Sequence, residues 1–213
     1  MIRVKVCGLT RECDVRAAAA LGADALGFIL APSPRRVTLE RAASLVRGLD
    51  PFVARVAVLS DPTEAELREV IGSRIFDCLQ FHGGEEPGRL AGLPLKTVKA
   101  FGVSGREDLE RVEIYAEAAD YFLFDTKAGG ASGGTGQAFD WSLLSGRSFS
   151  RPFILAGGLG PENLPRALEK VRPAAVDLNS RIESATGVKD AVLMARAILA
   201  ARRSNMDETR GDS

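Results

Sequence analysis

The sequence predicts a single-domain α/β protein with the closed (β/α)8 architecture of a TIM barrel, and three observations support this. Short apolar runs alternate with helix-length segments along the chain, and eight such pairs can be traced. Eight units in 213 residues match the strand count and the lower size limit of this barrel. The competing fold, an open doubly wound sheet, usually shows a GxGxxG motif after its first strand, where this chain has Cys7-Gly8-Leu9-Thr10.

The expected strands are apolar runs bounded by glycine, proline or other turn residues. They cover residues 2–7, 23–30, 52–59, 75–81, 95–101, 121–124, 152–156 and 174–178. In the first strand the residues alternate in character, so that Lys5 and Cys7 share the face opposite Val4 and Val6. Apolar strands separated by helices imply a parallel sheet that the helices cover.

A helix is expected after each strand. The expected helical segments are 11–21, 38–49, 61–71, a short segment from 85, 105–116, a segment from 140, 161–171 and 188–203. Thr10 and Thr38 are the expected N-caps of the first two helices, and Gly22 is the expected stop of the first. We expect the barrel to span residues 1–203 and the polar residues 204–213 to be disordered.

The charge balance argues against two classes of protein. Lysine and arginine number 28, as do aspartate and glutamate, so the formal net charge is zero. Binders of nucleic acid or of membrane surfaces usually carry an excess of positive charge. The N-terminal sequence lacks the features of a signal peptide. No apolar run approaches the roughly 18–20 residues that a membrane helix needs.

The cysteines and the single histidine predict neither disulfides nor a metal centre. Cys7, Cys13 and Cys78 are unevenly spaced, in neither a disulfide framework nor a zinc pattern. One histidine, His82, excludes a site with several histidine ligands. We expect a reduced, cytoplasmic protein without metal, in which Cys13 and Cys78 serve packing.

Polar residues gather at the carboxyl ends of the expected strands, where barrels of this type carry their chemistry. The candidates are Cys7, Arg35, Gln80, His82, Asp125, Gly157, Gly158, Asp177 and Ser180.

The segment 121–141, YFLFDTKAGGASGGTGQAFDW, is the most informative of these strand ends. A buried strand ends at Asp125, and a loop with five glycines between Gly129 and Gly136 follows. A flexible Gly/Ser linker is the alternative interpretation of the loop. The same strand-then-glycine order recurs elsewhere in the chain, which favours the edge of an active site.

Loop glycines after the sixth and seventh strands, with small polar residues after the eighth, fit a phosphate site. Backbone N–H groups and the N-terminus of a short helix after strand eight would bind the anion. The chain has no Walker lysine motif, so a small sugar phosphate fits better than a nucleoside triphosphate.

Cys7 is the sharpest catalytic candidate. A free cysteine is commonly a buried apolar residue. Cys7, however, ends its strand and lies one layer above Lys5, whose charge would favour the thiolate. Lys5 needs a partner inside the barrel, and Asp177 on the closing strand has the matching alternation. We predict a structural Lys5–Asp177 ion pair.

The other candidates have simpler alternatives. Asp125 is an acid or base in one interpretation and a cap or salt-bridge partner in the other. Arg35 is a ligand-binding cation or, as we expect for Arg36, a solvated surface charge. His82 is a structural residue that fixes its loop, or it contacts the substrate.

These motifs, in this order, resemble the phosphoribosylanthranilate isomerase family of tryptophan biosynthesis. The similar stretches are KVCGLT (5–10), SPR (33–35), LQFHG (79–83), DTK (125–127), GGTG (133–136), FDW (139–141), AGGL (156–159), PEN (161–163) and VD (176–177), with Ser180 and Glu183. The resemblance covers the chain to about residue 203. Arg181 is a departure, because the family usually has glycine there, and Phe81 stands where leucine is usual.

The resemblance implies a cofactor-free Amadori rearrangement of N-(5′-phosphoribosyl)anthranilate to 1-(2-carboxyphenylamino)-1-deoxyribulose 5-phosphate. Asp125 would be the general acid and Cys7 the general base. Arg35 would hold the anthranilate carboxylate. The other implied substrate-binding residues are Gln80, His82, Gly134, Gly136, Gly157, Gly158, Asp177 and Ser180.

Two other functions stay open at this point. One is a related phosphoribosyl isomerase of histidine biosynthesis, whose sites commonly use two aspartates. The other is a non-catalytic barrel that binds a sugar phosphate. In each case we expect a small-molecule phosphoribosyl ligand, no nucleic acid or membrane partner, and a monomer or homodimer.

Overall fold

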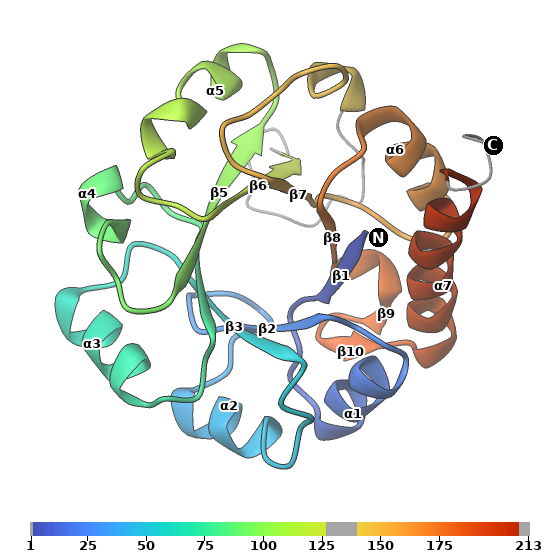
Figure 1. The fold of residues 1–213 in the computed structure, drawn as a ribbon. Helices are drawn as coiled ribbons and strands as arrows, with labels where there is room; N and C mark the ends of the chain where they lie inside the picture. The colour runs from blue at the N-terminus through green and yellow to red at the C-terminus, as the bar shows by residue number, and fades with distance from the viewer. Residues whose placement is uncertain (1, 127–139, 209–213) are drawn as a thin grey trace.

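The computed structural model describes residues 2–126 and 140–208. Eight parallel strands close into a barrel in the order β1-β2-β3-β4-β5-β6-β7-β8, and helices surround it (Figure 1). The barrel closes because β1 pairs with β8, with Lys5 opposite Asp177 in the register. The predicted fold is therefore confirmed, and the open sheet is excluded.

The barrel strands are β1 (Arg3–Val6), β2 (Ala25–Ile29), β3 (Ala54–Leu59), β4 (Cys78–Phe81), β5 (Lys96–Val103), β6 (Tyr121–Thr126), β7 (Phe153–Leu155) and β8 (Ala175–Leu178). Six lie inside their expected ranges, whereas β5 and β6 extend further. These two continue together, because Gly102 pairs with Asp125 and Val103 with Thr126. Asp125 is thus inside its strand, and the expectation that the strand ends before it was wrong.

The α-helices are α1 (Glu12–Ala20), α2 (Leu39–Leu45), α3 (Glu64–Gly72), α4 (Pro87–Leu90), α5 (Glu107–Glu110), α6 (Leu164–Val171) and α7 (Ala191–Glu208). The 3-10 helices are η1 (Val112–Tyr115), η2 (Trp141–Leu143) and η3 (Ser180–Ile182). The helix expected over 105–116 is therefore split into α5 and η1, and only η2 begins near residue 140. The last helix extends past its expected end at residue 203.

Of the two predicted N-caps, Thr38 is confirmed and Thr10 is wrong. The side chain of Thr38 accepts a hydrogen bond from Arg41 N, at 3.1 Å, and caps α2 as expected. Residue Arg11, without a side-chain bond, caps α1. Thr10 Oγ1 instead donates to the Gly187 carbonyl at 2.6 Å, because a hairpin from the end of the barrel reaches it.

That hairpin is absent from the sequence analysis. Strands β9 (Glu183–Ala185) and β10 (Val188–Lys189) pair antiparallel where the last helix was expected to begin. Each strand is too short for its periodicity to be recognised. The hairpin lies beside β1 and α1 in Figure 1, and its two strands contain Glu183 and Lys189.

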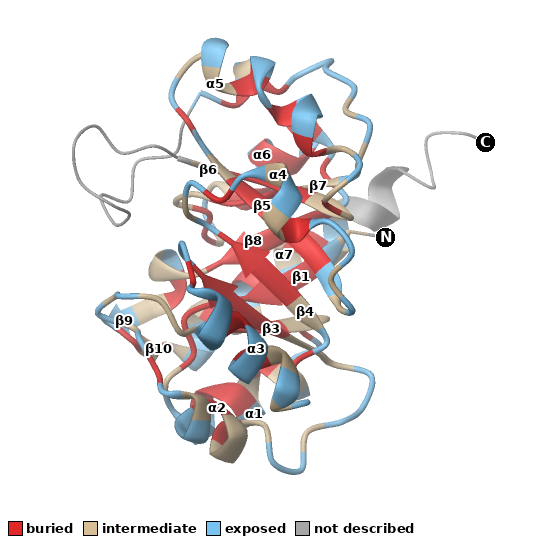
Figure 2. Cartoon of the chain, turned by 90° about the vertical axis from the view of Figure 1, so that its left-hand side faces the viewer, coloured by how far each residue is buried: buried red, intermediate tan, exposed pale blue. Residues whose placement is uncertain are grey.

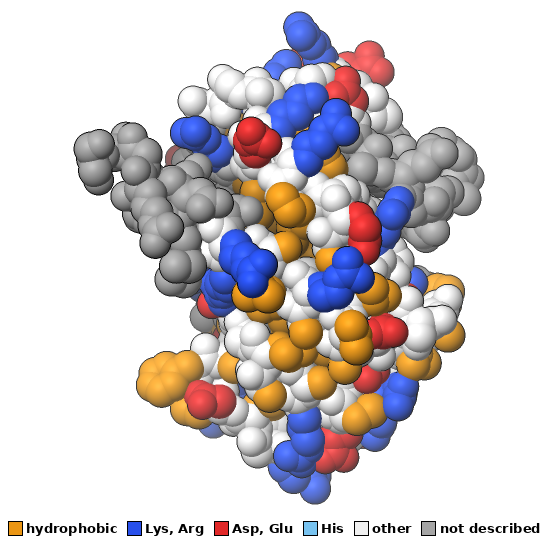
Figure 3. All heavy atoms as spheres, turned by 90° about the vertical axis from the view of Figure 1, so that its right-hand side faces the viewer, with side chains coloured by type: hydrophobic (Ala, Val, Ile, Leu, Met, Phe, Trp, Pro, Cys, Tyr) orange, Lys and Arg blue, Asp and Glu red, His pale blue; other side chains and the backbone are white. Residues whose placement is uncertain are grey.

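Apolar side chains form two buried layers, one outside and one inside the barrel. Figure 2 shows the buried strands between exposed helix surfaces. The outer layer joins strands to helices through residues such as Val4, Phe28 and Phe124. The inner cluster comprises Val98, Ala100, Leu123, Ile154, Ala156 and Ala175. On the face that α1, α6 and α7 present, Figure 3 shows hydrophobic side chains interspersed with charged ones.

The predicted Lys5–Asp177 ion pair is confirmed. Lys5 Nζ lies 2.9 Å from Asp177 Oδ2, and the two side chains are 5% and 8% exposed. Burial by itself would lower the pKa of Lys5, but the Asp177 carboxylate and Cys7 outweigh it and raise that pKa. Lys5 therefore stays protonated inside the barrel, on the seam between β1 and β8.

Replacing one partner of the Lys5–Asp177 pair should lower the stability of the protein more than replacing both partners. Lys5→Met leaves the Asp177 charge buried without its partner, so we expect a loss of about 3–5 kcal/mol in the free energy of unfolding. Adding Asp177→Leu should recover most of that loss. Urea unfolding of both variants measures it.

The matched control is Arg16→Met, which breaks the Arg16–Glu12 pair on the surface, where the side chains are 66% and 59% exposed. It should leave the urea midpoint nearly unchanged. If the variant with both Lys5→Met and Asp177→Leu is as unstable as Lys5→Met alone, this explanation of the ion pair is wrong.

Candidate active site

The predicted site residues within the described part of the chain lie at one end of the barrel, because all eight strands are parallel. Cys7 follows β1, Arg35 lies after β2, and His82 follows β4. Gln80, Asp125 and Asp177 lie within β4, β6 and β8. The pair Gly157 and Gly158 follows β7, and Ser180 begins η3 after β8. Gly134 and Gly136 lie outside the described residues.

Cys7 is buried and its sulfur leans across to the neighbouring strand β2. A Cβ added to Gly27 would lie 2.8 Å from Cys7 Sγ and 3.1 Å from Lys5 Nζ. Both functional groups thus occupy the space that a side chain at position 27 would fill. Gly27 makes room for the thiol and the ammonium group together.

The surroundings of Cys7 include groups that raise the pKa of its thiol and groups that lower it. Burial raises the pKa of the Cys7 thiol, the Asp177 carboxylate adds to this, and Lys5 and Lys189 oppose it. Lys5 therefore favours the thiolate, as expected, but burial outweighs it and the pKa ends above its ordinary value. The thiolate, where it forms, is a stronger base than that of a free cysteine.

Arg35 is bound in an ion pair and is not the solvated charge of the alternative interpretation. Its Nε lies 2.8 Å from Glu183 Oε1, and its Nη2 lies 2.7 Å from Glu183 Oε2. The two side chains are 13% and 4% exposed. Arg36 is exposed as expected, and its Nε donates to the Leu30 carbonyl at 3.0 Å.

Lys189 joins Glu183 to the end of β8. Its Nζ lies 2.8 Å from Glu183 Oε1 and donates to Asn179 Oδ1 at 2.9 Å. The sequence pattern predicted Lys189 in a helix, so its contact with Glu183 was not expected. The one available signal was the Thr186-Gly187 turn between two short polar strands.

A second set of polar groups connects β4 with β6. Gln80 Nε2 lies 3.5 Å from His82 Nδ1, and His82 Nε2 lies 3.8 Å from Asp125 Oδ2. The second distance exceeds that of a direct hydrogen bond. Gln80 Oε1 is buried and has no hydrogen-bond partner among the described residues. His82 thus lies between a buried amide and the predicted acid.

Two glycines after β7 adopt backbone conformations that other residues rarely adopt. Gly157 and Gly158 have φ angles of +83° and +61°, in the left-handed region that glycine tolerates. The Asn163 side chain bridges the loop, donating to the Gly158 carbonyl at 2.8 Å and accepting from Gly160 N at 2.9 Å. The exposed Arg181 lies across from this loop, since a Cβ on Gly160 would be 2.9 Å from Arg181 Cβ.

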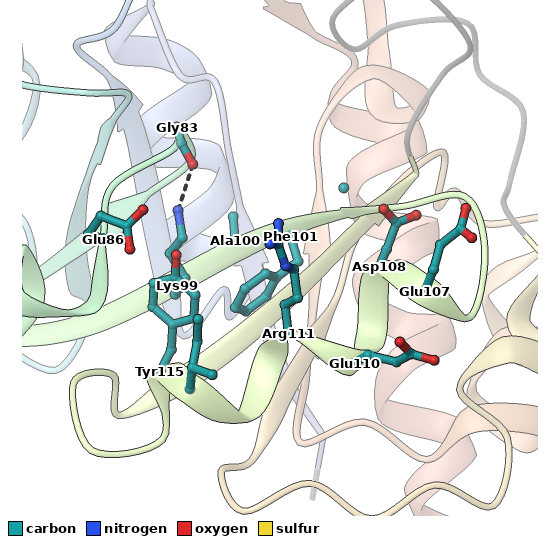
Figure 4. A pocket seen from close by; sticks show the side chains of 12 residues that line it. Gly83, Glu86, Lys99, Ala100, Phe101, Glu107, Asp108, Glu110, Arg111 and Tyr115 are labelled. Atoms are coloured by element: carbon teal, nitrogen blue, oxygen red, sulfur yellow. Dashed lines mark hydrogen bonds between the residues drawn. The ribbon is translucent and has the colours of Figure 1, made fainter.

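A cavity of about 770 Å³ lies elsewhere, beside the outer face of β5 and next to α5 and η1 (Figure 4). Its lining includes Glu86, Lys99 and Arg111, and it contains none of the predicted site residues. Lys99 donates to the Gly83 carbonyl at 2.6 Å and to Glu85 Oε2 at 2.7 Å. This buried pair, absent from the sequence analysis, secures the loop that follows His82.

Among residues 2–126 and 140–208, no group of three or more histidine, cysteine, aspartate or glutamate side chains could hold a metal ion. None of the described helices has the length and apolar character to cross a membrane.

Residues 4–200 match the family model described as N-(5'phosphoribosyl)anthranilate (PRA) isomerase. A Petrotoga mobilis protein named N-(5'-phosphoribosyl)anthranilate isomerase is 46% identical over 198 residues, which is 93% of this chain and 96% of the relative. A Pseudomonas aeruginosa protein of the same name is 42% identical over 98% of this chain and 99% of its own.

Several solved structures are also similar to this chain. The phosphoribosyl anthranilate isomerase of Thermotoga maritima is 36% identical, with a TM-score of 0.88 over 95% of this chain and 100% of its own. An isomerase in complex with reduced 1-(o-carboxyphenylamino)-1-deoxyribulose 5-phosphate is 34% identical, with a TM-score of 0.83 over the same shares. A structure of monomers generated from the dimeric Thermotoga maritima protein has a TM-score of 0.82, 34% identity and the same coverage.

Filling the space beside the thiol tests the packing around Cys7. In Gly27→Ala the new methyl group must displace Cys7 Sγ or Lys5 Nζ, so we expect a loss of about 1–3 kcal/mol in unfolding free energy. Urea unfolding measures it. Gly72→Ala is the control, because a Cβ there meets nothing within 4 Å. Equal stability of the two variants would contradict the close approach.

The Cys7 thiol should titrate at a higher pH than a free cysteine. Because burial raises its pKa, the thiol form persists as the pH rises past about 8.5, where an unperturbed thiol is half ionised. The difference in thiolate absorbance between the parent protein and Cys7→Ser, which both keep Cys13 and Cys78, isolates this group. A midpoint at or below the ordinary value would show that Lys5 outweighs burial.

Proposed function

The chain belongs to the family of N-(5′-phosphoribosyl)anthranilate isomerases, and we propose that Cys7 is its general base and Asp125 its general acid. The activity is an aldose–ketose isomerisation of tryptophan biosynthesis, in which N-(5′-phosphoribosyl)anthranilate becomes 1-(2-carboxyphenylamino)-1-deoxyribulose 5-phosphate. One observation carries the assignment of roles: a buried thiol directly after β1 and a carboxyl group within β6 lie at the same end of the barrel.

The reaction needs one proton donor and one proton acceptor. Asp125 protonates the furanose ring oxygen, the bond from C1′ to that oxygen breaks, and a Schiff base of the anthranilate nitrogen forms. Cys7, as the thiolate, then removes the proton from C2′. The resulting enolamine tautomerises to the ketone, so atoms and electrons balance without a redox partner.

Burial of Cys7 has a cost and a benefit in this scheme. It reduces the fraction of thiolate near neutral pH, because the pKa of the thiol is raised. It also strengthens the thiolate as a base toward a carbon-bound proton. The cations Lys5 and Lys189 limit the cost, since both oppose the increase in pKa.

We assign different residues to the two ends of the substrate. We assign the anthranilate carboxylate to Arg35, whose planar guanidinium suits a carboxylate. We assign the phosphate to the backbone at Gly157 and Gly158 and to Ser180, together with Gly134 and Gly136. Holding the phosphate far from the reacting bond fixes the orientation of the sugar.

Three further residues have supporting parts. Gln80 lies next to His82, which lies 3.8 Å from Asp125, and we propose that Gln80 and His82 contact the substrate or orient that carboxyl group. Asp177 has the least support as a substrate ligand, because its Oδ2 is paired with Lys5 at 2.9 Å. We propose that Asp177 has a structural role, because it holds Lys5 in position.

The location of the enzyme and its oligomeric state are the next part of the proposal. We propose a cytoplasmic enzyme that acts as a monomer or a homodimer, with a dimeric relative known from Thermotoga maritima. Sedimentation of the purified chain distinguishes the two states. The histidine-pathway isomerase and the non-catalytic barrel have no comparable support, because the family match spans residues 4–200.

The two catalytic roles predict a specific kinetic pattern. Cys7→Ala and Asp125→Asn should each reduce kcat by about a hundredfold or more while substrate binding is largely kept, because each removes a proton-transfer group. A fluorescence assay of phosphoribosylanthranilate consumption measures this. Cys13→Ala, which changes an exposed free cysteine, is the control and should retain full activity.

The assigned roles fail if either catalytic variant loses binding alone and keeps its kcat. Full activity of Cys7→Ser would also contradict them, and it would favour a site built on two aspartates.

A further inference from the structure

We propose that Glu183, on the hairpin β9–β10, is a positioning residue that presents Arg35 to the carboxylate of the substrate. This inference rests on the proposed role of Arg35 and adds a residue that acts through it. Four features of the structure support it: the geometry of the ion pair, the free edge of the guanidinium, the local charge balance and the attachment of the hairpin.

The ion pair has the geometry of an orienting contact. Glu183 Oε1 accepts from Arg35 Nε at 2.8 Å, and Glu183 Oε2 accepts from Arg35 Nη2 at 2.7 Å. Two parallel bonds fix the plane of the guanidinium as well as its distance, which a single contact does not. With side chains 13% and 4% exposed, the pair is shielded from the solvent that weakens surface pairs.

One edge of the guanidinium stays available. Glu183 uses Nε and one hydrogen of Nη2, whereas Nη1 donates to no residue in the described ranges. Arginine has five N–H donors in a rigid fork. The remaining edge, formed by Nη1 and the second hydrogen of Nη2, matches a carboxylate in the same two-bond manner.

The local charges leave one positive charge for a ligand. Glu183 lies between two cations, with Lys189 Nζ at 2.8 Å from its Oε1. Burial would raise the pKa of Glu183, but the hydrogen bonds and charges of Arg35 and Lys189 outweigh this and lower it. Two cations and one carboxylate sum to one positive charge, which the anionic carboxylate of a substrate would neutralise.

The hairpin is tied to the segment that carries Cys7. Thr10 Oγ1 donates to the Gly187 carbonyl at 2.6 Å, and Lys189 N donates to Asp14 Oδ2 at 3.1 Å. A Cβ on Gly8 would lie 2.7 Å from Arg35 Cδ, so the stem of Arg35 crosses the residue next to Cys7. Glu183 therefore holds Arg35 beside the proposed base.

A consequence separates positioning from a general structural role. If Glu183 acts through Arg35, its loss should weaken only ligands that carry the carboxylate. If it merely supports the fold, its loss should weaken all phosphoribosyl ligands alike.

The test compares two probes by calorimetry. One is reduced 1-(o-carboxyphenylamino)-1-deoxyribulose 5-phosphate, and the other is the same molecule without the carboxylate. Glu183→Gln keeps the size of the side chain and removes its charge. It should weaken the first probe about tenfold, the effect of losing a charge-assisted hydrogen bond, and change the second less than about twofold.

Four further variants make the result decisive. Arg35→Ala should weaken the carboxylate probe selectively, and Glu183→Gln in that background should add no further selective loss. Glu12→Gln, an exposed carboxylate paired with Arg16, is the matched control and should change neither probe. Glu183→Asp, which keeps the charge on a shorter side chain, should show the same selectivity to a smaller degree. It replaces Glu183→Gln if circular dichroism shows that variant to be unfolded.

Kinetics provide an independent measurement. Glu183→Gln should raise KM for the natural substrate while kcat is largely kept, as expected for loss of binding that is equal in the ground and transition states.

The outcomes test the positioning role of Glu183 separately from the carboxylate-binding role of Arg35. Selective weakening by Arg35→Ala but equal weakening of both probes by Glu183→Gln, or none, would overturn the positioning role alone. Equal weakening of both probes by Arg35→Ala would overturn the role of Arg35 in the proposed function, and the positioning role with it.

Discussion

The closure of the sheet between β1 and β8 is the constraint on which the rest of this structure depends. It puts Lys5 opposite Asp177, residues from the two ends of the chain, and allows an ion pair of 2.9 Å inside the barrel. The same closure brings the loop after β8 against the loop after β1. Cys7, Asn179 and the hairpin β9–β10 are neighbours for that reason.

Electrostatics at this seam follow from the balance of burial and charge. Cys7 has two lysines near it, yet burial dominates and its pKa is raised. The Glu183 side chain is also buried, yet two cations bond to it directly and its pKa is lowered. Glu183 receives direct hydrogen bonds from both cations at 2.7–2.8 Å, whereas at Cys7 the Asp177 carboxylate adds to the effect of burial. One fold therefore holds a weakly acidic thiol beside a firmly ionised carboxylate.

Prediction of structure from the sequence succeeded where one local pattern decides the structure. The alternation in β1 predicted which face Lys5 occupies, and the Thr38 cap depended only on residues that follow it. It failed where a distant segment intervenes. Thr10 was assigned to a cap, but the Gly187 carbonyl binds its hydroxyl. Asp125 was placed after its strand, but pairing with Gly102 of β5 extends the strand through it.

The amino-acid order by itself determined the number of strand–helix units, the end of the barrel that carries the polar residues, and the motifs that identify the family. Those features depend on periodicity and on residues near one another in the chain. Only the tertiary structure decided that Arg35 is held by Glu183, that Lys189 joins them, and that burial prevails over Lys5 at the thiol. Each of these depends on distances between residues far apart in the chain, and chain closure sets those distances.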